Sequence, residues 1–156
     1  MNDGVDRRNR DSAERLVALG ARLSDRDLEA EIDAPWSAAG LFAHIAFWDR
    51  FVLERWGLAA ERGERTPMAV DDGVMDRIND ASLRQWMSIP PRAAVQECAA
   101  AAAELDPFIA GIDDDVRSEL ASEGRERLVD RSLHREEHLR TIEAAFPLAG
   151  PAGDVG

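Results

Sequence analysis

The sequence predicts an all-α fold in the form of a four-helix bundle, and three observations support this fold class. Apolar residues recur at helical spacing in four long segments. Only one short segment alternates like a strand, and one isolated strand cannot make a sheet. Apolar residues make up 45% of the 156 residues, which is enough for one hydrophobic core. We therefore expect a single domain over residues 11–146, with a flexible N-terminus at residues 1–10 and a disordered, Gly- and Pro-rich tail at residues 147–156.

The first helix is expected to begin at Asp11, because Asp11 and Glu14 have the spacing of a capping box. Its buried face is expected to carry Leu16, Leu19 and Leu23. Residues 27–33 then alternate between acidic and apolar side chains. We interpret them as an extended connector that ends at Pro35, and therefore as a loop rather than part of a sheet.

The second helix is expected to begin near Ser37, which is a good N-cap residue, and to fade by Gly63. Its buried stripe is expected to contain Leu41, Ile45, Trp48 and Val52. A loop over residues 63–70 follows. A further helical stretch is expected over residues 76–87, and two prolines break it.

The second of these prolines, Pro91, suits the first turn of a third long helix. This helix is expected to bend near Pro107 and to be followed by a turn over residues 111–115. Its buried residues are expected to be Val95, Cys98, Ala102, Leu105 and Ile109. The last helix is expected to end at Phe146, before Pro147. Its buried residues are expected to be Leu128, Leu139, Ile142 and Phe146.

The charge and cysteine content exclude several classes of partner. The formal net charge is −12, from 31 acidic and 19 basic residues. Nucleic acids and anionic membrane surfaces select basic faces, so we expect neither as a partner. No apolar run approaches the roughly 20 residues of a membrane-spanning helix. A single cysteine, Cys98, allows no internal disulfide, and residues 1–10 lack the apolar core of a secretory signal, so we expect a cytoplasmic protein.

The three histidines of the chain form the pattern that carries chemistry. His134 and His138 are four residues apart on the last expected helix, so both rings leave one face, about 5–6 Å apart at Cβ. His44 lies on the second helix beside apolar aromatic residues. Three such rings can converge on one divalent ion and leave coordination positions open, as in catalytic sites. The structural interpretation is a solvated histidine pair and a core histidine whose hydrogen bonds are satisfied.

Two other metal patterns are rejected. The run from His134 to His138 matches the inverted zinc-protease pattern, in which Glu137 would be a general base. That pattern implies an acidic ligand far downstream, and only 18 residues follow His138. A di-iron carboxylate bundle needs Glu three residues before His, and Arg135 occupies that position.

Six further residues have both a functional and a structural interpretation. The candidates for a pocket wall, or for contacts that orient the ligand histidines, are Trp48, Asp49, Phe51, Asn79, Glu136 and Glu137. The structural interpretation is core packing for the aromatic residues and a solvated surface for the polar ones. Cys98 is interpreted as a small core residue rather than a nucleophile.

Two motifs resemble those of DinB/YfiT-like proteins. Residues 36–48 begin with Trp-Ser and continue into Leu-x-x-His-x-x-x-Trp, which is similar to the second-helix signature of that family. Residues 134–139 resemble its last-helix motif His-x-x-x-His-Leu. The Ile-Asn step at residues 78–79 resembles the helix after the first long connection. The resemblance extends over about residues 16–146.

The resemblance implies a four-helix bundle with up-up-down-down topology, commonly a homodimer. It implies one divalent metal ion, zinc or nickel among others, on His44, His134 and His138. It also implies thiol-dependent chemistry, since family members act as S-transferases or isomerases that use mycothiol, bacillithiol or glutathione. All three ligand positions are kept in this sequence.

Three functional hypotheses follow. The first is a metal-dependent transferase that activates a low-molecular-weight thiol for attack on a small electrophile. The second is a hydrolase that uses a metal-bound water. The third is a non-catalytic, stress-related bundle in which the ion only clamps the helices. The sequence names neither the metal nor the thiol, the electrophile or the pathway.

Overall fold

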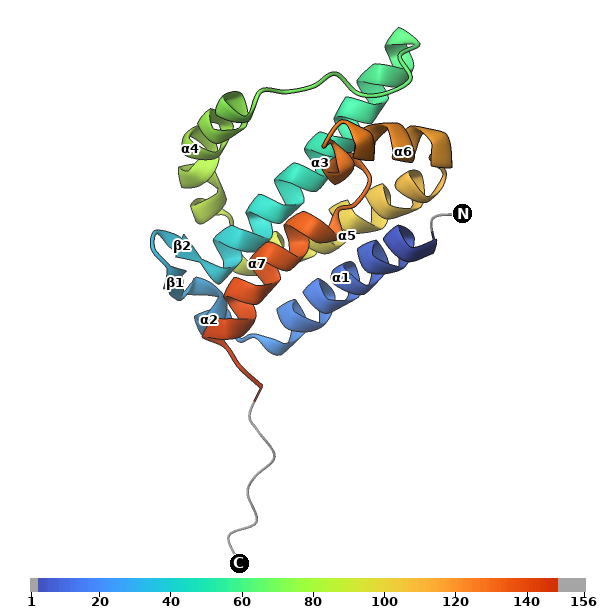
Figure 1. Cartoon of the computed structure of the whole chain (residues 1–156). Helices are drawn as coiled ribbons and strands as arrows, with labels where there is room; N and C mark the ends of the chain where they lie inside the picture. Colours follow the sequence, from blue (N-terminus) through green and yellow to red (C-terminus); the bar gives the residue numbers. More distant parts are fainter. Residues whose placement is uncertain (1–2, 149–156) are drawn as a thin grey trace, which may run out of the picture.

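The computed structural model describes residues 3–148, in which helices dominate and the all-α fold class is confirmed (Figure 1). The sheet structure in residues 3–148 consists of one two-stranded hairpin. None of the helices in residues 3–148 has the length and apolar content to cross a membrane. The elements are α1 (Asp3–Arg22), α2 (Asp25–Glu29), β1 (Glu31–Asp33), β2 (Trp36–Ser37), α3 (Ala38–Arg62), α4 (Asp72–Ser88), α5 (Pro91–Ala110), α6 (Asp114–Ser122), the 3₁₀ helix η1 (Glu126–Leu128) and α7 (Ser132–Ala145).

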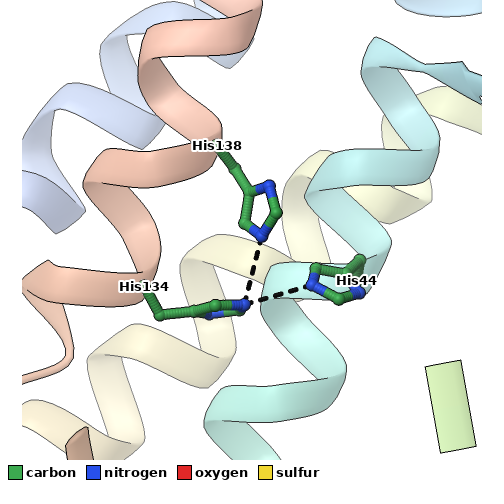
Figure 2. A group of neighbouring side chains, drawn as sticks. All are labelled: His44, His134 and His138. Carbon is green, nitrogen blue, oxygen red and sulfur yellow. Dashed lines mark hydrogen bonds between the residues drawn. The ribbon is translucent and has the colours of Figure 1, made fainter. Parts of the chain in front are cut away.

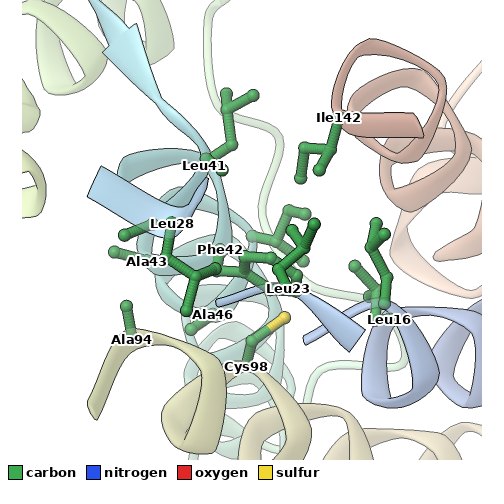
Figure 3. Packing of buried hydrophobic residues seen from close by; sticks show 14 of the residues in the cluster. Leu16, Leu23, Leu28, Leu41, Phe42, Ala43, Ala46, Ala94, Cys98 and Ile142 are labelled. Carbon is green, nitrogen blue, oxygen red and sulfur yellow. The ribbon is translucent and has the colours of Figure 1, made fainter. Parts of the chain in front are cut away.

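The four helices α1, α3, α5 and α7 pack around one main core (Figure 1). Figure 3 shows this core, in which Leu16 of α1, Cys98 of α5 and Ile142 of α7 meet the apolar face of α3. A second apolar cluster joins α3 and α5 to α6 and η1 at the other end of the helices. The expected core position of Cys98 is confirmed.

Contacts across the helices fix the directions of α1 and α7. Near the start of α1, the side-chain oxygen of Asn9 accepts a hydrogen bond from the N–H of Ser132, the first residue of α7. At the end of α1, Arg22 donates to the carbonyl oxygen of Phe146, just beyond α7. Helices α1 and α7 therefore run parallel.

Helices α3 and α5 also run parallel to each other. Arg50 in the middle of α3 contacts Glu97 of α5, and Trp56 farther along α3 packs against Phe108 farther along α5. Helix α3 is antiparallel to α7, because its early residue His44 meets His138 whereas the later Asp49 meets Arg131, just before α7.

The helix directions correct the expected topology. Along the chain, α1, α3, α5 and α7 run up, down, down and up, so the expected up-up-down-down order is wrong. That order needs two long connections between parallel neighbours. Here only the connection through α4 joins parallel helices, whereas α2 and the hairpin form a compact turn between antiparallel α1 and α3 (Figure 1).

Several boundaries agree with the sequence. Helix α3 follows Ser37, whose hydroxyl accepts a hydrogen bond from Gly40 N–H at 3.0 Å, and it ends at Gly63 in the left-handed region with φ 66°. Helix α5 begins at Pro91. The expected helix over residues 76–87 is longer, because Asp71 caps a start at Asp72.

Other expectations are wrong. Helix α1 begins at Asp3 rather than at Asp11, so residues 3–10 of the expected N-terminal segment are helical. Residues 31–33 pair with residues 36–37 in the antiparallel hairpin instead of forming a loop. Helix α6 begins inside the expected turn over residues 111–115. Leu128 belongs to η1 and not to the last helix. The expected tail lies outside the described residues from residue 149 onward.

Candidate metal centre

The three histidines meet between α3 and α7 (Figure 2). Nε2 of His134 lies 3.1 Å from Nε2 of His44 and 3.2 Å from Nε2 of His138. One ring nitrogen from each residue lies within 4.8 Å of the others. The convergence expected from the sequence is therefore confirmed, and it brings together residues from two antiparallel helices.

The helices position these rings from opposite sides. His134 and His138 are one turn apart on α7, while the next residues on its core side, Leu139 and Ile142, are fully buried. His44 is buried on α3 among tryptophan rings. The ring centroids of Trp86 and Trp36 lie 4.8 and 5.3 Å from that of His44. The apolar packing of both helices thus holds the rings in place.

The surroundings keep the three imidazoles neutral. Burial lowers the pKa of His44 to about 3, and electrostatic repulsion from Arg131, and from His138 if it takes up a proton, lowers it further. Burial and then the charge of Arg131 lower the pKa of His134, and burial also lowers the pKa of His138. Neutral imidazole is the form that binds a metal.

The nitrogen positions fit a divalent ion better than they fit hydrogen bonds alone. Metal–nitrogen bonds of about 2.0–2.1 Å at tetrahedral angles separate the ligand nitrogens by about 3.3 Å. The two Nε2 separations of 3.1 and 3.2 Å are close to that value. If Nε2 of His134 carries no proton, its single lone pair can accept a hydrogen bond from only one of the two neighbouring nitrogens. One cation can accept a lone pair from each of the three rings.

A buried ion-pair network lies behind the histidines. Asp49 is 0% exposed and accepts hydrogen bonds from Arg131 Nε at 2.9 Å and from Arg135 Nη2 at 2.8 Å. Arg131 Nη2 in turn lies 3.3 Å from Nδ1 of His134. Arg135 also pairs with Asp106 of α5 through both terminal nitrogens. Asp49 therefore reaches the histidines through Arg131 and is not a solvated surface charge.

A cavity of about 750 Å³ adjoins the three histidines. Trp48, Asn79 and Glu137 line it, and Trp48 Nε1 donates a hydrogen bond to Asn79 Oδ1 at 2.9 Å. Phe51 is not among the residues that line this cavity and instead stacks on Phe47. Three of the candidate wall residues thus meet at one cavity, on the side of the histidines where α4 crosses.

Two other candidate residues lie elsewhere. Glu136 pairs with Arg15 of α1, away from the cavity. Cys98 is buried in the main core, and burial raises the pKa of its thiol, so it is not a ready nucleophile.

The comparison with protein families matches residues 8–148 to the DinB superfamily. The chain belongs to the DinB superfamily. The match confirms the family resemblance of the motifs at residues 36–48 and 134–139. No curated protein and no solved structure matches the chain.

The arginines around the site of this DinB-superfamily chain are functional candidates that the sequence pattern did not predict. Arg131 and Arg135 are buried in the network, and Arg55, Arg125 and Arg127 line the cavity. All 19 basic residues are arginine, so nothing in composition distinguishes these five from the exposed ones. Their spacing was the available signal, because Arg131 and Arg135 lie one turn apart, each three residues before a ligand histidine.

The lowered histidine pKa values predict that the metal-free DinB-superfamily protein loses stability in acid. Below pH 6.5 the unfolded chain takes up protons that the buried His44 takes up only near pH 3. The free energy of unfolding should therefore fall as pH drops through this window, by about 1.4 kcal/mol per pH unit for each such histidine. Urea unfolding of chelator-treated protein from pH 7.5 to 4.5 measures the slope. A His44→Gln protein should have a shallower slope, and an unchanged slope would contradict the assignment.

Proposed function

We propose that this chain is a metal-dependent transferase that uses a low-molecular-weight thiol of the mycothiol, bacillithiol or glutathione type. The observation that carries the proposal is the position of three neutral histidines beside a cavity of about 750 Å³. A cavity of this size accommodates a small thiol together with an electrophile. Membership of the DinB superfamily supports the same proposal, because the resemblance to this family implies S-transferase chemistry. Zinc or nickel is the proposed ion on His44, His134 and His138.

A divalent ion on three imidazoles would supply positive charge that favours the deprotonated form of a thiol. The protein residues hold and shield this position. Trp36 and Trp48 form an apolar wall beside His44. Glu137, which also lines the cavity, offers a carboxylate that can accept the proton released by the thiol. The thiol sulfur then forms a bond to an electrophilic carbon, and the leaving group departs with its electron pair.

The nucleophile in this proposal comes from outside the protein. Cys98 is buried with a raised thiol pKa and does not line the cavity. The described residues around the histidines include no serine at the cavity wall. The reactive atom then comes from an external thiol or from water, and the proposal assigns it to the thiol sulfur. The expected homodimer and cytoplasmic location stay predictions.

A thiol screen on zinc- or nickel-loaded protein tests the proposal. Mycothiol, bacillithiol and glutathione are each mixed with a halogenated aromatic electrophile, and thioether formation is measured. The reaction should require the metal and should fall to background in the His138→Ala protein. Replacement of the exposed Arg140 on the same helix by glutamine should leave it unchanged.

Two other outcomes contradict the transferase. Metal-dependent hydrolysis of an ester without thiol consumption would favour a hydrolase with a metal-bound water. Loss of the fold on metal removal, without any reaction, would favour a non-catalytic bundle.

A further inference from the structure

One arginine at the cavity, Arg55, has no carboxylate partner among the described residues. Within residues 3–148, the other buried or half-buried arginines each form an ion pair with Asp or Glu. These paired residues are Arg50, Arg117, Arg125, Arg131 and Arg135. Arg55 on α3 is half-buried and forms no ion pair in this part of the chain. Its charge is therefore partly withdrawn from water without a carboxylate of the described residues in direct contact.

The hydrogen bonds of Arg55 are also incomplete. Nη2 donates to the carbonyl oxygen of Met68 at 2.6 Å, but Nε is buried without a hydrogen-bond partner. Burial lowers the pKa of Arg55, and the nearby positive charges of Arg125 and Arg131 lower it further. A buried donor next to like charges is unfavourable unless an anion completes the site.

Arg125 provides a second guanidinium on the same cavity. Its side chain donates to the carbonyl oxygen of Pro67 and pairs with Glu123, which does not line the cavity. The acidic residues on the cavity wall do not neutralise Arg55 through an ion pair. They are Asp72, Asp76, Glu126 and Glu137, of which Glu137 pairs with Arg127. Arg55 and Arg125 donate to the carbonyl oxygens of adjacent residues, Met68 and Pro67, so these two guanidinium groups lie near each other on a wall that also carries carboxylates.

Arg55 and His44 line this cavity from positions three turns apart on α3. His44, Trp48, Val52 and Arg55 all line it from one face of α3, at intervals of four, four and three residues. The 11 residues from His44 to Arg55, at a rise of 1.5 Å per residue, separate their Cα atoms by about 16.5 Å along the helix axis. An occupant that contacts both Arg55 and the three histidines must be an extended molecule rather than a small inorganic ion.

We propose that the cavity binds an extended organic anion whose negatively charged group contacts Arg55 and Arg125 while its other end reaches the three histidines. The contact with the histidines rests on the proposed function, in which the reaction takes place at the three histidines. The anionic group belongs either to the thiol or to the electrophile. Glutathione and bacillithiol carry carboxylates, whereas mycothiol carries none, so the assignment also bears on which thiol is used.

The test compares two fluorescent probes that differ only in one charge. 8-Anilinonaphthalene-1-sulfonate carries a sulfonate, and N-phenyl-1-naphthylamine is the same ring system without it. Binding is followed by energy transfer from the cavity tryptophans in metal-free protein, so the result does not depend on metal loading or catalysis. The sulfonate probe should bind the parent protein roughly tenfold more tightly than the neutral probe.

Substitutions assign this preference to the arginine. Arg55→Gln should remove the roughly tenfold preference and leave the neutral probe unaffected, whereas Arg55→Lys should keep part of it. Replacement of the exposed Arg62 on the same helix by glutamine is the matched control and should change neither probe. Unchanged binding of the neutral probe also shows that each variant has folded.

Two further pairs of compounds, each an acid and its ester, identify the source of the anionic group. Their binding is measured on metal-loaded protein. Glutathione is compared with its diethyl ester, and 4-chloro-3-nitrobenzoate with its methyl ester. If Arg55 is needed for tighter binding of glutathione than of its ester, the anionic group belongs to the thiol. If Arg55 is needed for tighter binding of the benzoate than of its ester, the anionic group belongs to the electrophile. Absence of an Arg55-dependent preference in all three pairs overturns the proposal. Probe binding without any thiol transfer would instead retain the anion site and reject the proposed reaction.

Discussion

Replacing His44 by alanine is expected to weaken zinc binding by more than about 100-fold, since loss of a residue that merely supports a ligand already costs 10–100-fold. His44 is the ligand candidate from α3, and its Nε2 lies 3.1 Å from that of His134. Without it, an ion would retain only the His134–His138 pair on one helix. Single substitutions of His134 and His138 are expected to have effects of the same size.

Titration calorimetry with zinc on chelator-treated protein measures these affinities, and metal analysis of untreated protein gives the occupancy. Arg140→Gln on the exposed face of α7 is a suitable control, because its side chain does not line the cavity. A His44→Ala protein that binds zinc as tightly as the parent would show that α3 contributes no ligand. Equal losses from all three substitutions would identify one site with three ligands.

Replacing Asp49 by asparagine is expected to lower the free energy of unfolding by about 3–5 kcal/mol, the usual effect of breaking a buried ion pair. Asp49 is 0% exposed and is the acceptor shared by Arg131 and Arg135. Asparagine keeps the size of the side chain but leaves two buried guanidinium groups with reduced counter-charge. Because Arg131 contacts His134, zinc affinity should also fall.

Urea unfolding of the Asp49→Asn protein measures the loss of stability. Glu97→Gln is the matched control, because it breaks the exposed pair between Glu97 and Arg50 and should change stability by no more than about 1 kcal/mol. If the two substitutions had the same small effect, the network around Asp49 would not be important for stability.

Sequence periodicity predicted where the main helices lie but not how they run. Ser37 and Pro91 marked helix starts that the structure confirms, because capping and proline geometry are local properties. Helix direction depends on the connections, and the helical period is the same in either direction. The start of α1 was placed too late, because the contacts of Asn9 with residues around the start of α7 cannot be read from local pattern.

The site was predictable only in part for a similar reason. Histidine is rare in this chain, so the spacing of His44, His134 and His138 stood out. Arginine is common and usually exposed, so its periodic pattern does not reveal that Arg135 is 0% exposed between Asp49 and Asp106. The role inferred for Arg55 depends on which carboxylates fail to reach it, and that requires coordinates.

The separation of the histidines along the chain bears on when a metal can enter. His44 and His134 are 90 residues apart, on helices that become neighbours only after α4, α5 and α6 have been made. A chain that leaves the ribosome from its N-terminus exposes α3 well before α7. No three-histidine cluster exists until α7 docks against α3 and alongside α1. Metal delivery would therefore follow folding, in contrast to zinc fingers, whose closely spaced ligands let the ion drive folding.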